Sequence, residues 1–118
     1  MLKKTVCSLL LVASPVFAEA PQVNHIAARE TADGVWRFDV TISHPDTGWD
    51  HYADGWRVLD MDGKQLGIRE LAHPHVEEQP FTRSLSGVRI PSDATQVQIQ
   101  ARDKPGGWNA DITVFDLP

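Results

Sequence analysis

The sequence predicts an all-β domain, a seven-stranded antiparallel sandwich of the immunoglobulin-like or fibronectin-like type. Apolar and polar residues alternate strictly from Val35 to Ser43, as expected of a strand with one buried face. The same alternation recurs over residues 96–102, where glutamines occupy the polar positions. Turn-forming dipeptides separate the segments, and seven short strands in about 100 residues are typical of such a sandwich.

Five weaker segments complete the predicted strands, and none of them shows a helical period. They cover residues 23–29, 55–61, 65–71, 81–90 and 110–115. Asp33-Gly34 and Asp62-Gly63 favour tight hairpins, because glycine accepts a positive φ. Ser86-Gly87 interrupts the alternation of its segment and predicts a β-bulge. Trp56, on the third segment, is expected in the core.

The first 18 residues have the features of a cleavable secretory signal peptide. Lys3 and Lys4 precede an apolar run, and small or β-branched residues precede a cut after Ala18. The run is much shorter than the roughly 20 residues that cross a bilayer. Cys7 lies too early in the run to become a lipidated first residue. The sequence therefore predicts one periplasmic or secreted domain at residues 19–118, with no membrane anchor after cleavage.

Cleavage would also change the chemistry of the chain. The full sequence has 11 basic and 16 acidic residues, and loss of the two leader lysines leaves 9 basic residues and a formal charge of −7. No basic cluster remains, so nucleic acid is not an expected partner. The one cysteine is removed as well, which excludes disulfide bonds and a thiolate copper centre in the mature domain.

The expected strand directions gather the histidines at one end of the sandwich. If seven strands run alternately up and down, one end is formed by loops 44–53, 72–80 and 104–109. All five histidines are expected on that side, including His25 near the start of the first strand. Neutral imidazole is a ligand for zinc and copper(II). The candidate metal ligands are His44, His51, His73 and His75.

Other interpretations of the same end stay open. His-Pro occurs twice, so these histidines also fit hydrogen-bonding residues where strands end. The end also carries aromatic and acidic residues suited either to contact with an envelope protein or a glycan, or to closing the core. These residues are Trp49, Tyr52, Trp108, Glu77 and Glu78. No nucleophile elbow, phosphate-binding loop or catalytic cysteine is present, so an enzyme is the weakest alternative. A metal-assisted hydrolase stays open, because the four histidines could leave a water on the ion.

Two segments carry a resemblance to known proteins. The first is HPDTGWDHYADGW, from His44 to Trp56, and the second is HPHVEEQPFTRSL, from His73 to Leu85. They resemble a family of small, uncharacterised exported bacterial proteins, some of which are labelled thiol-disulfide isomerase. The resemblance implies export and a single domain. Thiol exchange needs a thiolate, and Cys7 leaves with the leader, so isomerase activity is not expected of this chain.

Overall fold

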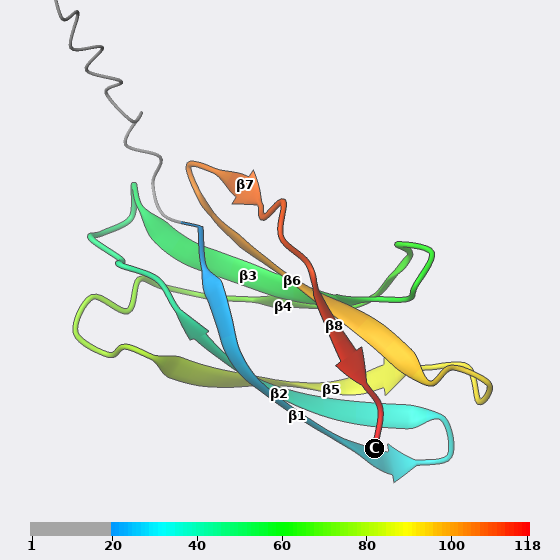
Figure 1. The fold of residues 1–118 in the computed structure, drawn as a ribbon. Helices are drawn as coiled ribbons and strands as arrows, with labels where there is room; N and C mark the ends of the chain where they lie inside the picture. The colour runs from blue at the N-terminus through cyan, green and yellow to red at the C-terminus, as the bar shows by residue number, and fades with distance from the viewer. Residues whose placement is uncertain (1–19) are drawn as a thin grey trace, which may run out of the picture.

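The computed structural model describes residues 20–118, and the signal peptide expected at residues 1–18 lies outside them. The described residues contain eight β-strands in two antiparallel sheets and no helix (Figure 1). Nothing in this part of the chain offers a helix long and apolar enough to cross a membrane. The expected all-β class is therefore confirmed.

The first sheet has three strands in the order β1-β2-β5. These strands are β1 (Gln22–Ala32), β2 (Val35–Ser43) and β5 (Phe81–Arg89). Ala32 pairs with Val35, so Asp33 and Gly34 form the predicted two-residue hairpin loop, and Gly34 has a φ of 73°. The register between β2 and β5 shifts between Trp36 and Phe38, opposite residues 86 and 87 of β5. This shift is the predicted bulge.

The second sheet is built around β6. Its strands are β3 (Tyr52–Leu59), β4 (Gln65–Glu70), β6 (Gln96–Lys104), β7 (Gly107–Trp108) and β8 (Thr113–Asp116). β3 pairs with β4 and β6, and β7 and β8 pair in succession with the opposite ends of β6. The prediction of seven strands was wrong by one, because β7 has only two residues and cannot show an alternating pattern.

Alternating side chains from the two sheets form the core. Every second residue of β2 from Trp36 to Ile42 is buried, and so are Val97, Ile99 and Ala101 of β6. Trp56 of β3 is fully buried in the same cluster, as its position in the sequence predicts. The chain therefore keeps its apolar residues between the sheets and places the glutamines of β6 on the other face of the strand, where Gln100 is also buried.

Truncation of a central side chain tests this core. Ile99→Ala removes a fully buried branched side chain and leaves a cavity between the sheets. We expect the free energy of unfolding to fall by about 2–5 kcal/mol in urea denaturation. Val114→Ala is the matched control, because that side chain is 50% exposed and should change the free energy little. Equal losses in the two variants would contradict the assignment of Ile99 to the core.

Candidate metal centre

The two inward-facing rows of core residues end in polar side chains at one end of the sandwich. On β2 the buried positions run through Ile42, and the next position of the same parity is His44. On β6 they run through Ala101 to Asp103. Both polar residues are almost fully buried, at 3% and 4% exposed. The alternation that builds the core therefore also brings an imidazole and a carboxylate into its end.

A tight turn adds a second imidazole. Gly48 and His51 form an isolated β-bridge, in which the His51 N–H donates to the Gly48 carbonyl at 3.1 Å and the Thr47 N–H donates to the His51 carbonyl at 2.9 Å. This turn holds the half-buried His51 ring against His44, with 4.7 Å between the ring centroids and a tilt of 38°. The structure thus brings together two of the histidines that the sequence singled out.

His44, His51 and Asp103 form a group that can hold a metal ion. Each of the three offers one ligand atom, and these atoms all lie within 4.8 Å of one another. His44 Nε2 and Asp103 Oδ2 are 3.7 Å apart, and both atoms are buried with no hydrogen-bond partner among residues 20–118. Ligand bonds of about 2.0–2.2 Å place two ligands of one ion no more than about 4.3 Å apart. The 3.7 Å between His44 Nε2 and Asp103 Oδ2 therefore fits two ligands of one ion.

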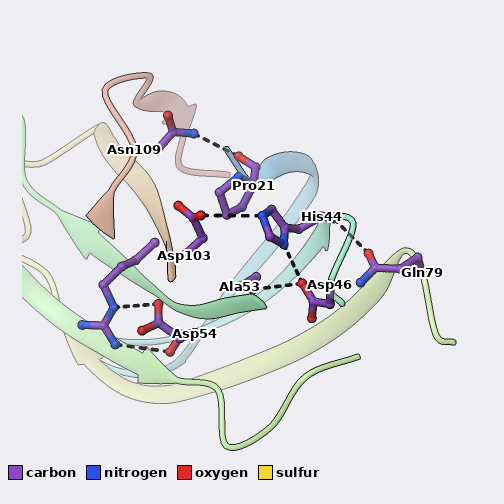
Figure 2. A network of polar contacts seen from close by, with 9 residues as sticks. Pro21, His44, Asp46, Ala53, Asp54, Gln79, Asp103 and Asn109 are labelled. Carbon is purple, nitrogen blue, oxygen red and sulfur yellow. Dashed lines mark hydrogen bonds and ion pairs between the residues drawn. The ribbon is translucent and has the colours of Figure 1, made fainter. Parts of the chain in front are cut away.

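The second ring nitrogen of His44, Nδ1, contacts the carboxylate of Asp46. His44 Nδ1 lies 2.6 Å from Asp46 Oδ1, and that oxygen also accepts from the Ala53 N–H at 2.9 Å (Figure 2). Because this carboxylate acts as an acceptor, Nδ1 carries a proton, and in the neutral ring Nε2 then presents a lone pair toward Asp103. Two acceptors that face each other in a dry site repel, and a cation between them removes the repulsion.

The 72–80 loop supports His44 rather than reaching the group. Asp46 Oδ2 accepts from the backbone N–H of His75 at 2.8 Å. The Gln79 side chain accepts from the His44 N–H at 2.9 Å (Figure 2). It also donates to the His75 carbonyl at 2.9 Å. These contacts fix the 44–53 loop and the 72–80 loop relative to each other. The 72–80 loop therefore sets the position of His44 through Asp46 and Gln79.

His73 and His75 form a separate pair. Their ring centroids are 4.5 Å apart, and the His75 ring stacks on Phe81 at 3.9 Å. His75 Nε2 accepts from the Arg83 guanidinium at 2.8 Å, so this nitrogen is not free for a metal. His25 lies on β1 opposite Thr41. Neither the pair nor His25 belongs to the three-residue group among the described residues.

Glycine is required beside the carboxylate of Asp103. A Cβ on Gly106 would lie 2.7 Å from Asp103 Oδ1, which is closer than any normal contact to a side-chain carbon. The turn after β6 therefore folds tightly over this carboxylate. Nearby, the Asn109 amide donates to the Pro21 carbonyl at 2.9 Å and ties the start of β1 to the same end (Figure 2).

The aromatic residues of this end differ in exposure. Trp49 is 65% exposed at the tip of the turn, and it contacts the buried Tyr52 edge to face at 5.7 Å. Trp108 is half-buried on the outer face of the second sheet, with the Arg57 and Arg102 guanidinium groups 3.9 and 4.9 Å from its ring centre. Of the three, only Trp49 offers a large free aromatic surface.

The two predicted acidic contact residues are exposed. Glu77 and Glu78 lie on the 72–80 loop, and a carboxylate oxygen of Glu78 is 3.5 Å from an Arg83 nitrogen. An ion pair of this exposure contributes little to stability. Both glutamates are thus available to solvent near the histidine pair.

Asp46 and Asp103 were not among the candidate ligands derived from the sequence. For Asp103 a signal existed, since it continues the alternation of Val97, Ile99 and Ala101 by one more step. For Asp46 no pattern in the sequence distinguishes it from other loop acids. Its role depends on three contacts with separate parts of the chain.

Comparisons with known proteins add one relative. Over 79 residues the chain is 40% identical to a protein of Halomicrobium mukohataei named "Putative lipoprotein", and the match covers 67% of this chain and 38% of the relative. The chain therefore spans less than two-fifths of that protein's length. No family model and no solved structure matches the chain.

The environment of His75 predicts how stability depends on pH. Burial lowers the pKa of His75 below its ordinary value of about 6.5, and the adjacent Arg83 charge lowers it further. The unfolded chain therefore takes up a proton at this position before the folded chain does. We expect the free energy of unfolding to decrease as the pH falls below about 6.5.

His75→Phe is the variant that isolates this contribution, because a phenyl ring can still stack on Phe81. Urea denaturation at several pH values between about 7.5 and 5, with a chelator present, should give a shallower decrease for the variant than for the wild type. The same slope in both proteins would show that His75 does not titrate as its surroundings predict.

Proposed function

We propose that the protein binds a divalent transition-metal ion through His44, His51 and Asp103. The observation that carries this proposal is the pair of buried acceptors, His44 Nε2 and Asp103 Oδ2, which face each other at 3.7 Å without partners among the described residues. The 3.7 Å between the two atoms is too long for a hydrogen bond from a neutral Nε2–H, which needs a separation of about 3.2 Å or less. An ion satisfies both atoms at once.

The donor set favours zinc or copper(II). Two imidazoles and one carboxylate are ligands that both ions accept, whereas calcium and magnesium prefer oxygen ligands alone. The described residues contain no cysteine, so a thiolate copper site is not available here. Copper(II) should bind more tightly than zinc, in keeping with the general order of affinities.

We further propose that this is an exported accessory domain acting in the periplasm or after secretion. The leader-like residues 1–18 and the name of the Halomicrobium relative support export. The strand order supports an immunoglobulin-like sandwich, with β1, β2 and β5 in one sheet and β3 and β6 in the other. In this version β4 joins the second sheet.

Recognition of an envelope protein or a glycan is the second candidate function, and the exposure of Trp49 is the observation that favours it. A tryptophan that is 65% exposed at a turn beside the candidate site provides contact area with a polar N–H. Trp49→Ala should leave metal affinity unchanged if the two functions are separate. Loss of a defined partner in that variant alone would favour recognition.

Metal titration of the untagged domain tests the proposal. Isothermal titration with zinc should give one site with a dissociation constant of about a micromolar or tighter, roughly −8 kcal/mol. Asp103→Asn and His51→Ala should each weaken binding by about 100-fold or more, because each removes one of three ligands. Near-UV circular dichroism checks that both variants keep the native packing.

The histidines outside the group provide the controls. His25→Ala and the double variant His73→Ala, His75→Ala should bind zinc as the wild type does, provided that they fold. If zinc binding is lost in the double variant but kept in Asp103→Asn, the metal site lies in the 72–80 loop and the proposed ligands are wrong. No wild-type binding at micromolar zinc would contradict the proposal itself.

Asp46 should control metal affinity without touching the ion. Its carboxylate orients His44 through Nδ1, and removal of such a support typically lowers metal affinity by about 10- to 100-fold. We expect Asp46→Asn to show a loss of that size in the same titration. Asp54→Asn is the matched control, because Asp54 pairs with Arg102 at 3.0 Å and is not part of the group. Equal affinities for both variants would contradict the role of Asp46.

A further inference from the structure

The turn that carries His51 is held mainly by bonds within itself. Its two backbone hydrogen bonds, from the His51 N–H to the Gly48 carbonyl and from the Thr47 N–H to the His51 carbonyl, both close on the turn. Trp49 and Asp50, at its tip, are exposed. No ion pair among residues 20–118 involves the turn. It can therefore open without breaking an ion pair to the rest of the domain.

The ring of His51 is the contact between this turn and the first sheet. It lies 4.7 Å from the ring of His44, which directly follows β2. Trp49 contacts Tyr52, the first residue of β3, so that contact stays on the side of the second sheet. The His51 ring is only half-buried. A contact between two rings, one of them partly in water, holds the turn weakly.

A metal ion would strengthen this contact by linkage. His51 is one of the three ligand residues, and its loss should weaken binding by about 100-fold. An ion that binds more tightly when His51 is in place favours that position of His51 by the same factor. The bound ion should therefore disfavour opening of the turn by up to about 100-fold.

We propose that the bound ion closes the turn of residues 48–51 onto the sandwich and thereby fixes the exposed indole of Trp49. This inference rests on the proposed metal site. Trp49 precedes the ligand His51 by two residues within one tight turn, and its side chain is 65% exposed. The surface that Trp49 offers is then ordered by the metal, so recognition through Trp49 would depend on metal loading.

Amide hydrogen exchange measured by NMR, with and without zinc, tests this coupling. The His51 N–H reports the turn directly, because opening of its bond to Gly48 lets the ring leave the group. We expect saturating zinc to slow its exchange by about 10- to 100-fold. Relaxation of the Trp49 indole N–H should show a higher order parameter in the zinc-bound domain.

A second turn in the same molecule provides an internal reference. The Gly63 N–H donates to the Asp60 carbonyl at 3.1 Å in the turn between β3 and β4, the same length as the bond from His51 to Gly48. Its exchange should not respond to zinc. Two variants of the first turn complete the comparison, each measured at a zinc concentration that saturates it. Asp50→Asn should keep the wild-type response, because Asp50 is not in the ligand group, and His51→Ala should lose it.

The outcomes separate the closing of the turn from metal binding itself. Zinc that binds but leaves exchange at position 51 within about twofold of the zinc-free rate would overturn the inference and leave the metal site standing. Slower exchange in His51→Ala as well would also overturn it, because the effect would not pass through that ligand. Absence of zinc binding would overturn both proposals.

Discussion

The carboxylate of Asp46 accepts hydrogen bonds from three separate parts of the chain, the ring of His44, the backbone of Ala53 and the backbone of His75. The carboxylate is buried, so the loss of any one contact would leave a donor unpaired at a cost of about 1–3 kcal/mol. The contact with His44 fixes the proton on Nδ1 and directs the lone pair of Nε2 toward Asp103. The candidate metal centre depends on this one side chain.

The sandwich provides the other half of the arrangement. The alternation of β2 and β6 continues past the apolar core by one step, to His44 directly after β2 and to Asp103 on β6. Two strands from different sheets thereby place a neutral donor atom and a carboxylate oxygen 3.7 Å apart in a dry site. His51, the third member of the group, is only half-buried.

Much of the fold could be predicted from the sequence, because strand alternation and turn chemistry are local. The hairpin at Asp33, the bulge beside Gly87 and the burial of Trp56 all follow from neighbouring residues. The site could be predicted only in part. The expected strand directions placed His44 and His51 at the same end of the sandwich. The His75 ring instead stacks on Phe81, away from those two histidines, and no local sequence pattern predicts that contact.

The most direct test of the central claim is the position of the metal itself. Crystals of the domain soaked in zinc, measured on both sides of the zinc absorption edge, would locate the ion by its anomalous signal. The account predicts a peak about 2.0–2.2 Å from His44 Nε2, from a ring nitrogen of His51 and from an Asp103 oxygen. A peak held by His73 and His75 instead, with none near Asp103, would contradict it.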